Sequence, residues 1–560
     1  MRKVVAALLL AGILTSGCGA AAPTPLPTLS PTPAPTTTPS SPPPTATPAP
    51  PTRTPTPWRV WFDPAVPLAV RDEVLDALAA VDTSPASSAA QSDLRIGLNM
   101  PLLLARWVYA IVVPFPTLTD EVSWAEVLRF WAGEPGALTA ISDGAESPSL
   151  FVAPETLGVL HGLLGPSSSE VPITIVEPDE LLDRAWASRP HAWAVVPFED
   201  LRPRWKVLKV DGANVLDKGL RVERYPLAVS IGAEGQGAGV LVSSLAEAVG
   251  PLTNREADQI TTLVMTGVTA LVRGIADRMK QKGILYPAEH LRSLLKEADL
   301  LHISNEISFA TECPPPDPNT DSLAFCSDPR YIELLRAVGT DVVELTGNHV
   351  RDYGSRPMLD TLDMYCDEGW YYYGGGKNLE DARESIIVRR NGAEFAFVGC
   401  NPVGPDSAWA TVDKPGAAPC EKEHLRIQLT ALKDQVDVTV ATLQYWELYQ
   451  YEPTLQQQLD FRDLVDAGAV IVSGSQAHHP QAIEFYQDGF IHYGLGNLFF
   501  DQMWSLGTRQ AFVDRHVIYQ GHHISTELLT FMLEDYSQPR PMTAEERRGL
   551  LKAVFEASGW

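Results

Sequence analysis

Three segments of the sequence each run from an apolar stretch into a turn that carries histidine, asparagine or an acid. They are DVVELTGNHVRDYG (341–354), AGAVIVSGSQAHHPQ (467–481) and GFIHYGLGNLFFDQ (489–502). Metal ligands are commonly held this way, because a buried strand fixes the backbone and the following loop presents imidazole, amide and carboxylate groups. Three such segments within about 160 residues predict one composite polar site.

The first two segments offer an asparagine and three histidines. Asn348 and His349 follow Gly347, which permits a sharp turn. An amide oxygen and an imidazole nitrogen suit a divalent transition metal, and His349 is also a candidate general acid. Of the adjacent His478 and His479, one would ligate and the other would support the ligand. The alternative for each motif is a turn whose polar side chains only stabilise the loop.

Two further places add acidic and amide groups. HISNEISF (302–309) puts Asn305 and Glu306 after the predicted strand DLLHI. Glu306 is a candidate metal ligand and Asn305 a candidate neighbour of the ligands, whereas a carboxylate that caps a helix is the alternative. Asp501 follows the tight turn YGLGN (493–497) and is a candidate partner of a ligand.

Composition limits the function classes. The 560 residues carry a formal charge of −26, and 45% of them are apolar. This length predicts two or three domains with real cores. The negative charge disfavours nucleic-acid binding and docking on anionic lipid by charge, since both surfaces would repel the chain.

Residues 1–18 are typical of a bacterial export signal. Arg2 and Lys3 precede a short apolar run, and Thr15-Ser-Gly-Cys18 resembles a lipobox. We therefore expect Cys18 to be lipidated and to anchor the chain to the membrane on its extracytoplasmic side. An ordinary secretory signal, with Cys18 lost on cleavage, is the alternative.

Residues 19–57 are dominated by Pro, Thr, Ser and Ala. Such a composition buries no core, so this segment is predicted to be a disordered, extended tether. Export permits disulfides. The pairs Cys313–Cys326 and Cys400–Cys420 each bracket a loop and are the first and second candidates for bridges.

Residues 58–250 predict one α/β domain. A strand is expected at WRVWFDP, a helix at 68–81, and another helix beginning near Ser123. The motif VVPF occurs at 112–115 and again at 195–198, each time where a buried strand meets a turn. This domain resembles the two-lobed periplasmic solute-binding fold, and a generic strand-turn repeat is the alternative.

Residues 251–535 predict a second α/β domain in which strands and helices alternate irregularly. Strands are expected at TTLVMTGVTALV, AEFAFVG and VTVATLQY, and helices at 288–298, ARESI and QLTALKDQV. Residues 536–560 are predicted to form a C-terminal helix, because Thr543 and Glu546 make a capping box that begins it.

The polar segments, in this order, resemble the CapA-type family of capsule and poly-γ-glutamate synthesis, which has the calcineurin-like metallophosphatase fold. The resemblance covers about 260–505 and rests on Asn305-Glu306, Gly347-Asn348-His349 with Asp352 and Gly354, the segment Gln444–Tyr449 with Glu447, His478-His479-Pro480-Gln481, and Tyr493–Asn497. It implies an αββα sandwich, a divalent metal such as Mn, Fe or Zn, and ligands Glu306, Asn348, His478 and His479. His349 would be the catalytic acid.

Three positions depart from the family pattern. Val268 stands where the first-strand aspartate is expected, and Gln444 and Gln481 each stand in place of a histidine. A valine has no lone pair to offer, and an amide oxygen is a poorer transition-metal ligand than imidazole. Glu447 lies one position before the family's glutamate. These changes put a two-metal centre in doubt.

Two functions therefore remain open for the second domain. One is a metal-dependent phosphoesterase in which metal-bound water attacks phosphorus and His349 protonates the leaving oxygen. The other is a non-catalytic module that binds an envelope polymer. A third hypothesis makes residues 58–250 a solute sensor.

Overall fold

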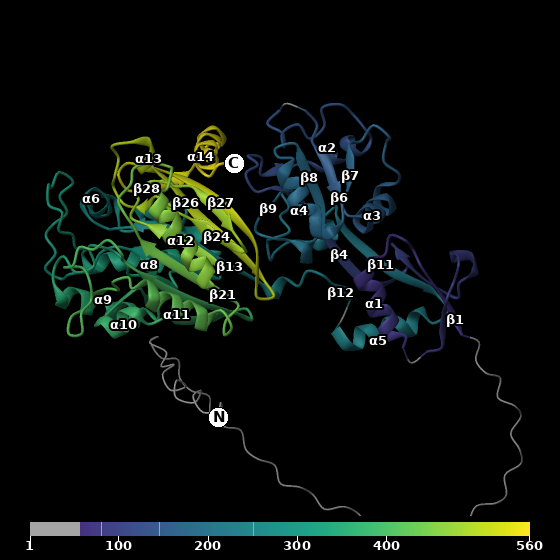
Figure 1. Ribbon diagram of the computed structural model, residues 1–560, viewed down its shortest axis with the longest axis horizontal. Coiled ribbons are helices and arrows are strands. Elements are labelled where there is room, and N and C mark those ends of the chain that lie inside the picture. The colour runs from purple at the N-terminus through teal and green to yellow at the C-terminus, as the bar shows by residue number, and fades with distance from the viewer. Residues whose placement is uncertain (1–56, 80, 145, 250) are drawn as a thin grey trace, which may run out of the picture.

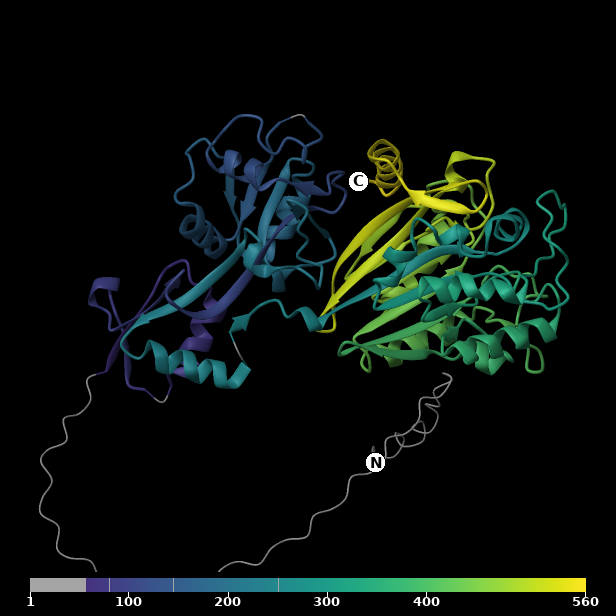
Figure 2. The same cartoon turned by 180° about the vertical axis from the view of Figure 1, so that it is seen from behind.

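A computed structural model describes residues 57–560 except 80, 145 and 250. The signal and Cys18 lie outside the described residues, as does the tether up to residue 56. Within the described residues, every helix is too short or too polar to cross a bilayer. The chain forms two units that lie side by side (Figures 1 and 2).

The first unit is built on one ten-stranded mixed sheet with the path β2-β1-β3-β11-β4-β8-β6-β7, to which β9 and β12 add by pairing with β4. Its strands are β1 Trp58–Phe62, β2 Thr83–Pro85, β3 Leu94–Leu98, β4 Leu102–Pro114, β6 Ser149–Val152, β7 Ile173–Ile175, β8 Ala192–Pro197, β9 Trp205–Val207, β11 Ala228–Gly235 and β12 Leu252–Thr253. A separate pair joins β5 Glu121–Val122 and β10 Lys209–Val210. The helices are α1 Leu68–Ala77, α2 Trp124–Trp131, α3 Pro154–Leu164, α4 Pro178–Ala187 and α5 Ala238–Val249.

The long strand β4 explains the repeated VVPF motif. Its residues from Trp107 to Pro114 are buried, and it pairs antiparallel with β8, so that Ile111 lies opposite Val195. The two motifs are thus neighbours in one sheet. The predicted start of α2 is confirmed, because the Ser123 hydroxyl accepts a hydrogen bond from the backbone N–H of Glu126.

The second unit contains two larger sheets. The eight-stranded sheet comprises β13 Ile260–Thr269, β14 Leu300–Asn305, β15 Val342–Glu344, β16 Tyr371–Tyr373, β25 Asn497–Phe499, β26 Gln510–Tyr519, β27 His522–Glu534 and β28 Gln538–Pro541. The six-stranded sheet comprises β18 Ile386–Arg390, β19 Ala393–Cys400, β21 Val438–Gln444, β22 Ile471–Ser475, β23 Ile483–Tyr486 and β24 Gly489–His492. A short pair joins β17 Gly375–Gly376 and β20 Gly416–Ala417.

Helices cover the outer faces of these two sheets. They are α6 Arg273–Lys282, α7 Arg292–Lys296, α8 Ile332–Val338, α9 Ser355–Glu368, α10 Leu379–Arg383, α11 Lys422–Leu432 and α12 Leu455–Ala467. The chain also forms the short helix α13 Leu506–Arg509 and the C-terminal helix α14 Ala544–Ala557, whose Leu551 and Phe555 belong to the core between the sheets. Alternate strand residues face opposite cores. Val264 packs with α6 to α9, whereas Leu263 and Met265 pack with Phe395 and Phe397 of the other sheet. The order of layers is helix, sheet, sheet, helix.

Most local predictions for this unit are confirmed, with two exceptions. The capping box that starts α14 is present in both directions, and both disulfides, Cys313–Cys326 and Cys400–Cys420, are formed. The helix expected over 288–298 is wrong in extent, since only α7 forms there. The helix expected at ARESI is also wrong, because α10 ends at Arg383 and β18 begins at Ile386, which pairs with Phe397.

Candidate functional site

The carboxyl ends of four strands from both sheets meet at one place. In the eight-stranded sheet, β14 and β15 run parallel, and in the six-stranded sheet β21 and β22 do so. Each of these strands ends just before or at a polar side chain of the site. They are Glu306 after β14, Asn348 after β15, Gln444 at the end of β21 and Gln476 after β22.

These four side chains, here called the polar quartet, converge on one nitrogen atom. Gln444 Nε2 donates to Glu306 Oε1 at 2.9 Å and lies 3.3 Å from Asn348 Oδ1. It also makes a short hydrogen bond to Gln476 Oε1. Glu306 and Gln444 are almost completely buried. The sequence reasoning identified three members and missed Gln476, whose only signal was its place two residues before the His-His pair.

Gly347 lets two of the loops approach. A Cβ atom at this position would lie 2.5 Å from the Cα of Glu306, closer than real side chains come. Only glycine permits this contact, so the Gly-Asn-His motif brings Asn348 beside the carboxylate of Glu306.

His349 stands at the edge of the quartet and is partly exposed. Its Nδ1 is 2.7 Å from Asp352 Oδ2, and the same carboxylate oxygen accepts the backbone N–H of Phe325 at 2.8 Å. The Phe325 ring lies 4.6 Å from the imidazole. Asp352 thus orients the His349 ring through Nδ1. The other ring nitrogen, Nε2, is not bonded to Asp352.

The two adjacent histidines point to different places. His478 Nδ1 is 2.8 Å from Asn497 Oδ1, and its ring packs 5.2 Å from that of Phe500. His479 donates from Nδ1 to the carbonyl of Pro480 at 2.7 Å, and burial lowers the pKa of its imidazole. Its Nε2 faces Gly507, where an added Cβ would lie 1.9 Å away. His479 is therefore not directed at the quartet.

The remaining candidates support the surrounding structure. Asn305 donates to the carbonyl of Ile307 and to the hydroxyl of Tyr365. Gln481 accepts from Gln457 at 2.9 Å. Glu447 lies in an exposed loop and accepts from Tyr449.

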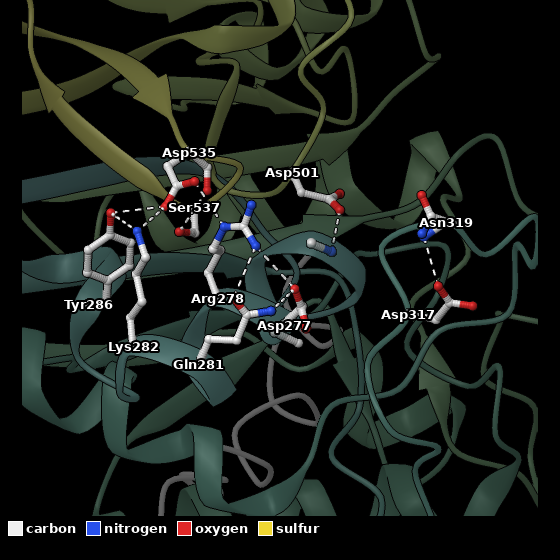
Figure 3. Close-up of polar contacts among 12 residues, drawn as sticks. Asp277, Arg278, Gln281, Lys282, Tyr286, Asp317, Asn319, Asp501, Asp535 and Ser537 are labelled. Carbon is white, nitrogen blue, oxygen red and sulfur yellow. Dashed lines mark hydrogen bonds and ion pairs between the residues drawn. The ribbon is translucent and has the colours of Figure 1, made fainter.

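Asp501 anchors a helix. It accepts from the backbone N–H of Gly274 at 2.6 Å and is ion-paired with Arg273, so it holds the first turn of α6. Figure 3 shows Asp501 in the same region as the α6 side chains Asp277 and Arg278. The other end of that helix is tied to Asp535 by Arg278 and Lys282.

Hydrocarbon fills the position of the missing aspartate. Val268 is 1% exposed and belongs to a small apolar cluster, here called the apolar plug, made of Val268, Ala270, Val272, Ile307, Phe325 and Phe500. Its two phenylalanines, Phe325 and Phe500, contact His349 and His478 respectively. Arg273 lies over the same two rings, 5.2 and 4.8 Å from their centroids.

The residues present do not fit a transition-metal centre. The acceptors of the quartet point at an amide N–H₂ group, and the plug occupies the side of the missing aspartate. Among the described residues, no group of three or more His, Cys, Asp or Glu side chains is placed to hold a metal ion. The chemistry that this arrangement supports is hydrogen bonding, to which His349 adds a partly exposed imidazole.

A second polar layer lies beneath the quartet, between the sheets. Glu344 is buried and accepts from Thr346 Oγ1 at 2.5 Å, and burial raises the pKa of its carboxyl. His302 contacts the hydroxyl of Tyr373 at 2.7 Å, and burial lowers the pKa of the imidazole to about 3. These groups hold the strand ends in place but do not reach the surface.

The surface beside the site offers a pocket and exposed aromatic rings. A pocket of about 560 Å³ is lined by Arg273 and Phe325 and by the loop that the Cys313–Cys326 disulfide closes. The loops that follow Gln444 and Asp501 carry Trp446, Tyr449 and Trp504, here called the aromatic rim, which are 56%, 45% and 61% exposed. The rings of Tyr449 and Trp504 are 5.9 Å apart.

Comparisons with solved structures give only distant likenesses. A 5′-nucleotidase precursor from Thermus thermophilus is 14% identical, with a TM-score of 0.29, and the alignment covers 54% of this chain and 58% of that one. An ABC-type phosphate transport receptor from Vibrio cholerae is 10% identical, with a TM-score of 0.27, over 33% of this chain and 93% of the receptor.

Sequence comparison is more specific. The chain is 27% identical over 303 residues to the capsule biosynthesis protein CapA of Bacillus anthracis. This alignment covers 53% of this chain and 73% of that relative. The family model of the bacterial capsule synthesis protein PGA_cap matches residues 262–502, the segment that contains the quartet, the plug, His349 and His478. Residues 262–502 are therefore similar to the PGA_cap capsule synthesis family, in agreement with the resemblance that the order of the sequence motifs indicated.

Proposed function

We propose that this protein is a lipid-anchored, extracytoplasmic factor in the assembly of a capsule or other extracellular polymer, and that it binds the polymer rather than hydrolysing a phosphoester. The observation that carries the proposal is the PGA_cap match over the segment that forms the site. The lipid anchor rests on Cys18 and the sequence around it.

Binding is favoured over hydrolysis by the state of the quartet. Metal-assisted hydrolysis needs a cation that lowers the pKa of a water molecule. In this chain the buried acceptors are directed at the amide of Gln444, and hydrocarbon surrounds Val268. His349 remains able to bond a ligand group through Nε2.

The aromatic rim supplies a surface of the right kind for a long polymer. Exposed Trp and Tyr rings offer large, rigid contact area with polar edges. Three of them stand in two loops that leave the site. Asp501, at the start of one of these loops, is ion-paired with Arg273, which lines the pocket. Since the chain has a net charge of −26, a polyanion such as poly-γ-glutamate would be repelled at long range. Its binding should therefore strengthen as salt screens that repulsion.

The proposal is tested by sedimentation of the full-length chain, in detergent, with poly-γ-glutamate and with a neutral dextran. We expect Trp446→Ala and Trp504→Ala together to weaken binding of the preferred polymer by about tenfold or more. Ile175→Ala, which removes an equally exposed apolar side chain from the first unit, is the control and should change nothing. Equal binding by all variants to every polymer would contradict the proposal.

The cellular role is tested in the source organism. Disrupting the gene should lower the amount of surface polymer, and the wild-type gene should restore it, whereas Cys18→Ser should restore less. Efficient hydrolysis of an aryl phosphate by the purified chain with added Mn²⁺, lost in His349→Ala, would instead support the phosphoesterase hypothesis. A solute-sensing role for residues 58–250 stays a prediction from the sequence.

A further inference from the structure

The quartet has the form of a cation site whose centre is a side-chain nitrogen. Three oxygen atoms from Glu306, Asn348 and Gln476 surround Gln444 Nε2. They come from three loops that are distant in sequence, so their convergence is a property of the fold. One of the three, Glu306, is a carboxylate that is only 2% exposed.

A buried carboxylate needs a positive or hydrogen-bonding partner, because an unpaired charge in the interior is strongly unfavourable. Among the described residues, no Lys or Arg is paired with Glu306, whereas the Gln444 amide donates to it at 2.9 Å. The amide N–H₂ group has two hydrogens and a partial positive charge, so it can serve several acceptors at once. The other amide atom, Gln444 Oε1, is buried without a partner. Turning the amide over would place this oxygen against three acceptors, so the orientation is fixed by its neighbours.

Apolar side chains close the site on the side of Val268, and this does not depend on the Gln444 amide. Val268 is paired with Ser304 in β14 and with Asn497 in β25, and its side chain lies in the apolar plug. A cation entering from this side would meet methyl groups and phenyl rings, which supply no ligand oxygen or nitrogen.

We propose that the amide of Gln444 takes the place of a metal ion in this pocket, so that the chain has a permanently filled, metal-independent site. The substitution of one residue type thereby converts a cation-binding arrangement into a hydrogen-bonded one. The inference does not depend on the polymer-binding function, because it concerns only what neutralises Glu306 and holds the four loops together.

The test is to replace the amide by a carboxylate, Gln444→Glu, in the full-length chain. Two buried carboxylates then face each other without a donor, and we expect the melting temperature to fall by on the order of 10 °C. Mn²⁺ or Ca²⁺ at millimolar concentration should restore much of this loss, because the variant offers two carboxylates and two amide oxygens to a cation. The melting temperature of the wild-type protein should not respond to either ion.

The matched control is Gln457→Glu. Gln457 is as deeply buried as Gln444, but it donates to Gln481 and to the carbonyl of Tyr493 rather than to a carboxylate. The Gln457→Glu variant should have a lower melting temperature than the wild-type protein, and neither Mn²⁺ nor Ca²⁺ should raise it. A Gln444→Glu variant that is as stable as the wild-type protein, or whose loss is not reversed by either ion, would overturn the proposal.

Metal analysis of the wild-type protein tests the same inference without any variant, and so applies even if Gln444→Glu does not fold. After gel filtration without chelator, we expect the content of Mn, Fe, Zn and Ca to be far below one equivalent per chain. Near-stoichiometric metal, or a wild-type melting temperature that rises with Mn²⁺, would show that the amide does not fill the site.

Discussion

At the scale of single residues, His479 shows how a ligand-like side chain can serve structure instead. Its ring is fixed by the Pro480 carbonyl and by an edge-on contact with Tyr451, 4.5 Å between centroids. Its other nitrogen then faces Gly507 in the short helix α13. The His479 ring therefore occupies the space that a side chain at position 507 would need.

We predict that Gly507→Ala destabilises the protein although alanine is the better helix former. The added methyl group would overlap His479 Nε2, and the buried ring has little room to move, so a loss of about 1–3 kcal/mol is expected. The measurement is the midpoint of urea unfolding.

The control lies in another helix of the same unit. A Cβ atom added at Gly549 in α14 would have no neighbour within 4 Å, so Gly549→Ala should stabilise the protein by up to about 1 kcal/mol. If both substitutions were stabilising, the position of the His479 ring would be wrong.

The site residues were predictable only in part, for a definite reason. Glu306 and Asn348 were identified because each follows an apolar strand. Gln444 was named only through the family resemblance, as a doubtful residue that stands in place of a histidine. Gln476, Phe325 and Phe500 carry no such signal, since nothing in a single sequence tells which loop side chain turns inward. The opposite directions of His478 and His479 also depend on backbone angles, such as the φ of +51° at His478, that the sequence does not display.

At the scale of elements, α14 illustrates a helix whose start is fixed locally. The Thr543 hydroxyl accepts the backbone N–H of Glu546, and the Glu546 carboxylate accepts the backbone N–H of Thr543. Thr543→Ala removes one of these bonds, and we expect a loss of about 1 kcal/mol. Thr543→Ser keeps the hydroxyl and should be nearly neutral. Thermal unfolding compares the two, and equal losses would show that the cap contributes nothing.

Three buried histidines in the eight-stranded sheet give the sandwich a pH dependence. Burial lowers the pKa of His302 in β14 to about 3 and that of His523 in β27 to about 4, and it lowers the pKa of His516 in β26 well below its usual range. The rings of His516 and His523 are 5.3 Å apart. All three are therefore neutral in the folded protein at pH 5, whereas unfolded histidines take up protons below about pH 6.5.

At these three histidines the unfolded chain thus binds more protons than the folded one between about pH 6.5 and pH 4, so their contribution to stability falls as the pH is lowered through this range. Each histidine contributes up to about 1.4 kcal/mol per pH unit. Glu344, which faces His302 at 3.8 Å, acts in the opposite direction, because burial raises the pKa of its carboxyl. Burial also raises the pKa of the Glu199 carboxyl to about 7, and this group acts in the same direction as Glu344. The contribution of the histidines is therefore isolated by replacing one of them.

The measurement is the free energy of urea unfolding at pH 5 and pH 7. His302→Gln should reduce the difference between the two by about one proton's contribution, whatever it does to the stability at pH 7. His424→Gln changes an exposed histidine and should leave the difference unchanged. An unaltered pH dependence in His302→Gln would mean that this histidine takes up a proton in the folded state as well.

Element prediction succeeded where length and pattern agreed. β4, β13 and β21 are apolar runs and were found, α14 was found from its capping box, and the start of α2 near Ser123 was also predicted. The failures at 288–298 and at ARESI concern short segments, where tertiary pairing outweighs local preference. The arrangement of two stacked sheets followed from the family resemblance and not from the alternation of strands and helices.

At the scale of the whole molecule, the two units lie side by side (Figure 1) and contact each other through aromatic and apolar side chains. Phe115, which follows β4, packs against Phe485, Phe490, Phe555 and Trp560 of the second unit. The core of the first unit also continues into Val517, Tyr519 and Ile524 at the ends of β26 and β27. These contacts indicate that the units unfold together.

Charged groups fix the same interface. Asp120 accepts from Arg547 of α14 at 2.7 and 2.9 Å and is ion-paired with Lys206 at 2.6 Å. Burial opposes the charged form of Asp120, but the two cations prevail and lower the pKa of its carboxyl to about 2. Burial lowers the pKa of Lys206 to about 8.

We predict that Asp120→Asn weakens the joint between the units, because it leaves Lys206 and Arg547 as like charges without an anion between them. Since the Asp120 side chain is 44% exposed, solvent screens part of the effect, and a loss of about 1–2 kcal/mol is expected. Differential scanning calorimetry should show the single transition broadening or separating into two. Glu423→Gln, which breaks the exposed pair with Arg426, should change stability by less than about 0.5 kcal/mol and leave one transition. A calorimetric trace for Asp120→Asn that matches this control would mean that the aromatic contacts of Phe115 alone couple the two units.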